Sequence, residues 1–133
     1  MDDLQAENLR IVKVMAENGI LGRWDIVRQY VSDDLVMHVP PSLPFGRDYH
    51  GWDGYLQMFK ELATFFTGLK SGETNYASFG DKVIVMSTLS GNVASNGKPI
   101  SFPITAVWQL KDGKVVDIVP FYYDTKAICD LAT

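Results

Sequence analysis

The sequence contains little of what disulfides, metal sites and many catalytic centres are made from. Cys129 is its only cysteine, which excludes an internal disulfide and a cysteine-based zinc site. The two histidines, His38 and His50, are twelve positions apart and have no cluster of acidic residues around them. Because metal sites need several such side chains converging on one point, we expect no metal ion in this protein.

Strong positive charge and long apolar segments are also absent. The net charge of −4 gives no basic surface for a nucleic-acid partner. No apolar run approaches the roughly 18–20 residues that a membrane-spanning helix needs, so we expect no membrane partner. The chain starts with acidic and polar residues, Met1-Asp2-Asp3, which does not resemble a secretory signal. A cytoplasmic location is the resulting expectation.

The last third of the chain is rich in the β-branched and aromatic residues that favour strands. Two such runs, 99–110 and 115–124, flank Asp112-Gly113, which predicts a tight turn because glycine accepts the positive φ required there. One long β-hairpin follows from this pattern. Alternation places Phe102, Ile104, Ala106 and Trp108 on one face of its first strand, and Asp117, Val119, Phe121 and Tyr123 on one face of its second strand.

Helices dominate the first half of the 133-residue chain, which we interpret as a single domain spanning residues 1–133. Helical periodicity predicts helices over 3–17, where Asp2 can cap the N-terminus, and over about 22–31. A third helix begins at Gly51, with Asp53 as its expected cap, and ends near Thr67. Helices followed by hairpin-linked strands predict an α+β fold, with the helices on one face of an antiparallel sheet.

A more specific resemblance covers the chain nearly end to end, and five segments carry it: Tyr30–Asp34, Val36–Pro40, Tyr49–Gly54, Val107–Lys114 and Pro120–Thr125. In their order and spacing they resemble the NTF2-like superfamily, in its SnoaL-like or ketosteroid-isomerase-like branch. The resemblance implies a cone-shaped fold in which three helices from the N-terminal half pack on a strongly curved antiparallel sheet. It also implies a ligand cavity inside the cone and a homodimer formed through the sheet.

The residues that such families use for catalysis are replaced here by apolar side chains. The tyrosine and the two aspartates of steroid isomerases fall at Met15, Val39 and Ala106, and the aspartate of SnoaL-type cyclases falls at Pro120. These replacements disfavour a steroid isomerase mechanism and a standard cyclase mechanism. The resemblance therefore implies the fold and a cavity, and leaves the reaction open.

Three other residues are candidate catalytic groups. His38 lies on the predicted strand Leu35–Val39, where alternation puts Leu35, Met37 and Val39 on a core face and His38 on the opposite face. If that opposite face is the one that borders the cavity, His38 would act as a general acid or base, since a free imidazole titrates near pH 6.5. Asp117 lies inside a predicted strand, where acids are uncommon, and it is otherwise a solvent-facing residue. Asp124 is either a catalytic acid or the N-cap of a short final helix. His50 is expected to be a solvated loop residue.

Aromatic residues supply the expected pocket lining: Trp52, Tyr55, Phe59, Phe102, Trp108, Phe121 and Tyr123. Such a pocket predicts a small apolar or aromatic molecule as the partner. One hypothesis is a cofactor-independent isomerase, cyclase, dehydratase or hydrolase that works by acid–base chemistry. The alternative is a non-catalytic ligand-binding or dimerisation module with the same fold.

Overall fold

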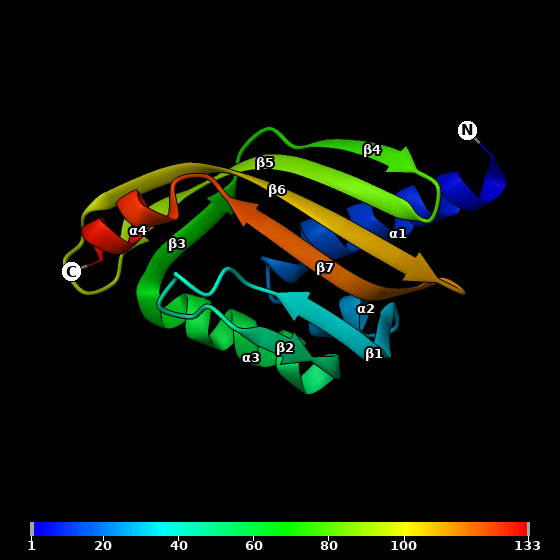
Figure 1. Cartoon of the computed structure of the whole chain (residues 1–133), viewed down its shortest axis with the longest axis horizontal. Helices are drawn as coiled ribbons and strands as arrows, with labels where there is room; N and C mark the ends of the chain where they lie inside the picture. Colours follow the sequence, from blue (N-terminus) through cyan, green and yellow to red (C-terminus); the bar gives the residue numbers. More distant parts are fainter. Residues whose placement is uncertain (1, 133) are drawn as a thin grey trace.

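The computed structural model describes residues 2–132 and has four helices and a seven-stranded sheet. The helices are α1 (Asp3–Gly19), α2 (Trp24–Arg28), α3 (Gly51–Phe65) and α4 (Thr125–Leu131). The strands are β1 (Val31–His38), β2 (Asp48–His50), β3 (Phe66–Ser71), β4 (Asn75–Phe79), β5 (Lys82–Val93), β6 (Pro99–Lys111) and β7 (Lys114–Tyr122). The predicted α+β class is confirmed, with α1 packed against β4 and β5 and α3 packed against β1 and β3 (Figure 1).

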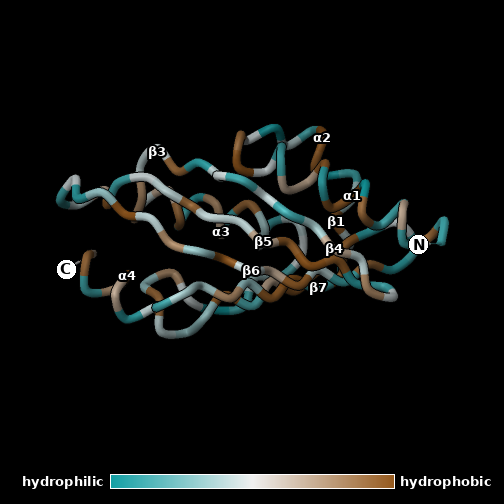
Figure 2. Tube along the Cα trace, turned by 90° about the horizontal axis from the view of Figure 1, so that it is seen from above, coloured by the Kyte–Doolittle hydropathy of each residue, from teal (hydrophilic) through white to brown (hydrophobic). Residues whose placement is uncertain are grey.

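All seven strands belong to one strongly curved sheet. Its order is β2-β1-β7-β6-β5-β3, and β4 pairs with β5 beyond the part of β5 that β3 occupies. The sheet is antiparallel except at one place, where β1 runs parallel to β7 and Met37 pairs with Ile118. Hydrophobic residues recur along β5, β6 and β7 in the tube view (Figure 2). The concave face of the sheet, covered by α1 and α3, holds the core.

Local sequence signals explain how the first helices begin and end. The Asp2 side chain accepts a hydrogen bond from the Gln5 backbone N–H, and the Gln5 side-chain oxygen accepts one from the Asp2 backbone N–H, which confirms the predicted cap. The second helix is shorter than predicted, because Val31 is buried and already pairs with Val115 of β7. The prediction that Asp53 caps α3 was wrong, because His50 is the N-cap residue of this helix and makes no side-chain capping bond.

The predicted hairpin is confirmed and joins β6 to β7. Asp112 and Gly113 have φ values of 52° and 77°, the left-handed pair that a two-residue hairpin turn requires. A register shift between Gln109 and Leu110 inserts a bulge in the β6–β7 pairing. Gln109 pairs with Asp117, while its neighbour Leu110 pairs with Val115. The bulge therefore changes which residues of β7 face the core beyond Val115.

A different helix is attached at each end of the curved sheet. The β5–β6 turn is tied to the last helix by Asn96, whose side-chain amide donates a 2.8 Å hydrogen bond to the Leu131 carbonyl. At the other end β2 leads directly into α3, so the position of this helix depends on the edge strand. Among residues 2–132, no helix is long and apolar enough to cross a membrane.

Candidate functional site

A cavity of about 650 Å³ lies between the helices and the concave face of the sheet. The end of α1 and one side of α3 form its roof, and β1, β5, β6 and β7 form its floor. Three of the residues expected to line a pocket do line this one: Tyr55, Phe59 and Trp108. Most other wall residues are aliphatic, including Met37, Met58, Leu62 and Ile118. The space therefore suits an apolar molecule of small-molecule size.

The positions at which the family resemblance places catalytic groups all lie in this wall. Met15 comes from α1, Val39 follows β1, Ala106 comes from β6 and Pro120 from β7. The four positions converge on one cavity although they are distant in the sequence. Here they present only apolar atoms to it.

Other expected lining residues lie elsewhere. Trp52 stacks on Tyr55 with ring centroids 5.7 Å apart, and it is not among the residues of the cavity wall. Phe102 stacks on Tyr122 in the same way, at 5.5 Å. These two rings support residues that line the cavity and do not line it themselves.

Phe121 and Tyr123 are on the outer face of the sheet and are 57 % and 69 % exposed. The prediction that these two side chains line the pocket was wrong, because the bulge in β7 reverses which side chains face inward. After Val115 the inward-facing residues are Ile118, Pro120 and Tyr122 instead of the odd-numbered series. Tyr122, which sequence reasoning missed, therefore lines the cavity.

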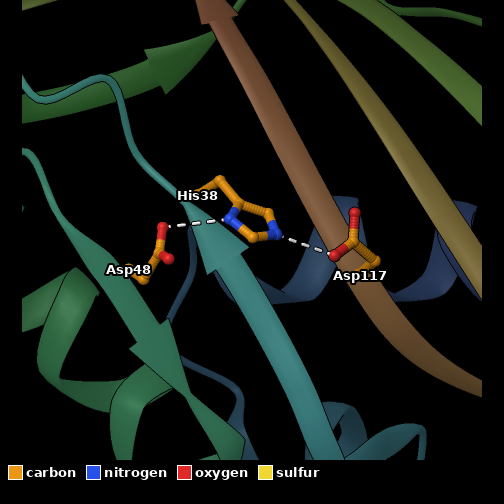
Figure 3. Close-up of polar contacts among 3 residues, drawn as sticks. All are labelled: His38, Asp48 and Asp117. Carbon is orange, nitrogen blue, oxygen red and sulfur yellow. Dashed lines mark hydrogen bonds and ion pairs between the residues drawn. The ribbon is translucent and has the colours of Figure 1, made fainter.

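His38 faces away from the cavity, on the outer side of the sheet (Figure 3). Its neighbours Met37 and Val39 line the cavity, so alternation turns the imidazole outward. Its Nε2 lies 2.8 Å from an Asp117 carboxylate oxygen on β7, and its Nδ1 lies 2.9 Å from an Asp48 oxygen on β2. The structure thus brings together two sequence candidates, His38 and Asp117, but outside the pocket that they were expected to serve.

This arrangement favours the protonated form of His38. A neutral imidazole has one N–H and can satisfy only one of two ionised carboxylates, whereas the protonated ring donates to both. The hydrogen bond with Asp117 raises the pKa of His38 most, partial burial opposes it, and Asp48 adds a smaller increase in the pKa. The ring is 39 % exposed, so water screens both contacts. Its two bonds connect β2, β1 and β7.

The remaining candidates have structural positions. The Asp124 side chain accepts a hydrogen bond from the Ala127 backbone at 3.1 Å, which makes it the N-cap of α4. Its φ of 58° is left-handed, a conformation that aspartate tolerates better than most residues. His50 is exposed at the start of α3. Within residues 2–132 no group of His, Cys, Asp and Glu side chains has the arrangement of a metal site.

The polar side chains of the cavity wall come mainly from the end of α1, from β3 and from the β3–β4 connection. Glu17 and Lys70 are exposed there. Thr74 and Ser87 are 3.0 Å apart through their hydroxyl oxygens, so these two groups satisfy each other. This part of the wall is thus polar, in contrast to the aliphatic and aromatic remainder.

The model of the SnoaL-like domain family matches residues 20–118 of this chain. A search of the curated proteins finds no significant match. Solved structures show the same fold at low identity. An NTF2-like protein of unknown function from Burkholderia pseudomallei is 18% identical, with 96% of this chain and 98% of that chain covered and a TM-score of 0.86.

Two further structures are similar over nearly their whole length. One is a putative SnoaL-like polyketide cyclase from a Jannaschia species, with 18% identity, a TM-score of 0.85, and 99% of this chain and 95% of that chain covered. The other is TerC co-crystallised with polyporic acid, with 16% identity, a TM-score of 0.82, and 95% of this chain and 98% of that chain covered. At these identities the similarity shows the fold alone.

Proposed function

The chain belongs to the SnoaL-like domain family, and we propose that it binds a mostly apolar small molecule in the cavity between its helices and its sheet. The observation that carries the proposal is the cavity itself, whose volume of about 650 Å³ falls within the range of ligand pockets. If this space stayed empty, the aliphatic and aromatic side chains around it would lack dispersion contacts on one side, which is energetically unfavourable. A ligand of matching shape restores those contacts. The co-crystallisation of the structurally similar TerC with the small molecule polyporic acid supports this proposal.

Ligand binding without catalysis fits the residues better than the enzymatic hypothesis does. His38 and Asp117 lie on the outer face, and Asp124 caps a helix. The four family positions in the cavity wall are apolar. We therefore place the non-catalytic binding module first among the two functions.

The second candidate is cofactor-independent proton-transfer chemistry on the bound molecule. One observation favours it: the phenol groups of Tyr55 and Tyr122 belong to the cavity wall. Burial raises the pKa of both, so they are neutral donors that can polarise a carbonyl oxygen. In this hypothesis the phenols replace His38, and Glu17 of the cavity wall is the available carboxylate.

A cavity-filling variant tests the binding proposal. Ala106 lies in the cavity floor, so Ala106→Phe would occupy ligand space, whereas Ala63→Phe adds the same atoms on the exposed side of α3. The probe is the neutral fluorophore N-phenyl-1-naphthylamine, titrated by fluorescence, with thermal unfolding measured on each variant. We expect saturable binding to the wild type and to Ala63→Phe, and at least tenfold weaker binding to Ala106→Phe. Equal affinity in a folded Ala106→Phe variant would contradict the proposal.

We also propose that a second copy of the chain covers the outer face of the sheet. Ile84, Val107 and Val119 pair side by side across β5, β6 and β7 and form a half-buried apolar row. The next row along the strands includes Met86 and Phe121, which are 44 % and 57 % exposed. Such a stripe on a self-complementary surface suits an isologous dimer.

A further inference from the structure

The residues that both line the cavity and are exposed to solvent mark the place where it opens. They come from only two segments, the end of α1 and the end of β3, and they are Glu17, Leu21, Lys70, Ser71 and Gly72. The other residues of the wall are buried or half-buried. The opening therefore lies between an α1 lip, residues 17–21, and a β3 lip, residues 70–72.

Each lip carries one charged side chain, and the two charges have opposite signs. Glu17 on the α1 lip and Lys70 on the β3 lip form no hydrogen bond or ion pair with any of residues 2–132, and they do not pair with each other. Opposite charges do pair elsewhere on this surface, as Arg47 does with Glu61. The opening thus presents a carboxylate and an ammonium group that are both available to a bound molecule.

The neighbours of Glu17 leave its carboxylate available for a cation. Burial raises the pKa of the Tyr76 phenol, and the nearby Glu17 carboxylate raises that pKa further, which places Glu17 beside this residue of the cavity wall. The Lys13 ammonium lies over the Tyr76 ring, 5.4 Å from its centroid, so this cation already has a partner. Glu73, in the β3–β4 connection, is exposed and is not part of the wall.

The interior behind the lips offers nothing to a charged group. Of the described residues that line the cavity, Glu17 and Lys70 alone carry a charge. The Thr74 and Ser87 hydroxyls satisfy each other at 3.0 Å. A molecule that fills this space and reaches the opening should therefore be apolar along its body and charged only at its end, because burying a charge without a partner is costly. An end with a single charge would attract one lip and be repelled by the other.

We propose that the cavity takes an amphipathic molecule whose apolar body fills the interior and whose zwitterionic head group lies in the opening, with its cation at Glu17 and its anion at Lys70. This inference rests on the proposed binding function and adds a class of ligand to it. Both charged residues are exposed, so each contact is a screened ion pair. Each is expected to change the affinity by roughly two- to fivefold.

Amphiphiles with the same dodecyl chain test the head group. The four ligands are the zwitterion N-dodecyl-N,N-dimethylglycine, the cation dodecyltrimethylammonium, the anion dodecanoate and the neutral triethylene glycol monododecyl ether. Each competes with N-phenyl-1-naphthylamine below its own critical micelle concentration, at about 0.15 M ionic strength, where charges more than about 8 Å apart are largely screened. We expect the zwitterion to bind about fivefold more tightly than each of the other three.

Variants then assign the two charges to the two lips. Glu17→Gln should weaken binding of the zwitterion and the cation by roughly two- to fivefold and leave the anion unchanged or tighter, and Lys70→Met should do the reverse for cation and anion. Glu73→Gln and Lys60→Met are the matched controls, because they remove the same charges from exposed residues outside the wall. Both should change every affinity less than twofold.

A charge swap separates the effect of charge from a loss of structure. The double variant Glu17→Lys with Lys70→Glu should bind the zwitterion about as tightly as the wild type does, since the head group can turn round, whereas each single reversal should bind it more weakly. Thermal unfolding shows whether each variant is folded.

The outcomes also separate this inference from the proposed function. If the neutral ether, the cation or the anion binds as tightly as the zwitterion, or if the lip variants behave like the controls, the head-group inference is overturned while ligand binding stands. If neither N-phenyl-1-naphthylamine nor any of the four amphiphiles binds the wild type, both proposals are overturned.

Discussion

Replacing His38 with glutamine should destabilise the protein in a manner that depends on pH. In the folded state the protonated ring donates to Asp117 and Asp48 and so joins three adjacent strands, β2, β1 and β7. Glutamine is similar in size and polarity but carries no charge and cannot donate to both carboxylates at once from these positions. The substitution therefore removes the charge-assisted part of both contacts.

The expected size of the effect follows from the exposure of the groups. The His38 side chain is 39 % exposed and Asp117 is 34 % exposed, so each contact resembles a screened surface ion pair. Such pairs contribute up to about 1 kcal/mol, and we expect about 1 kcal/mol for the two together. For a domain of this size that loss lowers the melting temperature by about 4 °C.

The pH dependence has a definite sign. Because the folded-state pKa of His38 is raised above that of the unfolded chain, its contribution is fully present below about pH 6.5. It disappears as the pH rises through the folded-state pKa. The difference in stability between the wild type and His38→Gln should therefore be largest near pH 5.5 and should vanish at high pH.

Urea denaturation followed by circular dichroism between pH 5.5 and 9 measures this difference. His50→Gln is the matched control, since the His50 side chain is exposed and is bonded to none of residues 2–132. Asp117→Asn should reproduce much of the His38→Gln loss, and the double variant should lose less than the sum of the two. A constant difference across the pH range, or the same profile for His50→Gln, would refute the inference that His38 is charged.

Two further predictions concern the outer face and the last helix. Met86→Glu and Phe121→Glu should each convert the dimer into a monomer, as measured by light scattering at micromolar concentration. Leu4→Glu, which changes an exposed residue of α1, should leave the dimer intact. A monomeric wild type would contradict the proposed dimer. Asp124→Ala should cost about 2 kcal/mol, because it removes both the cap of α4 and a residue that tolerates a φ of 58°, whereas Asp124→Asn should retain most of the stability. Guanidinium denaturation of the two variants would distinguish this role from one in ligand binding, and equal stability of Ala and Asn variants would argue against it.

Much of the fold could be predicted because its signals are local. The reciprocal bonds of Asp2 and Gln5, the positive φ values at Asp112 and Gly113, and the alternation of Leu35, Met37 and Val39 depend only on near neighbours. The bulge on β7 could not be predicted in this way. Nothing in Val115-Val116-Asp117 marks an extra residue, because the bulge depends on the pairing of β6 with β7. That single shift decided whether Tyr122 or Tyr123 faces the cavity.

The position of His38 shows a different limit of sequence reasoning. Alternation correctly separated the imidazole from the apolar residues Met37 and Val39. The hypothesis that it served the cavity treated core and cavity as opposite sides of the strand. In the structure they are on the same side, because the helices cover only one face of the sheet and the cavity is a part of the core. The partners of His38, Asp48 and Asp117, come from strands whose neighbourhood only the fold establishes.

The parallel pairing of β1 with β7 also affects how the chain folds. The β5–β6–β7 meander closes through short turns and so has a low entropic barrier to formation. The contact of Val36 with Asp117 must instead close a long loop that contains every element from β2 to β6. Proteins rich in such long-range contacts fold slowly. During synthesis β1 can pair with β2 early, but its other edge has no partner strand until β7 has been made.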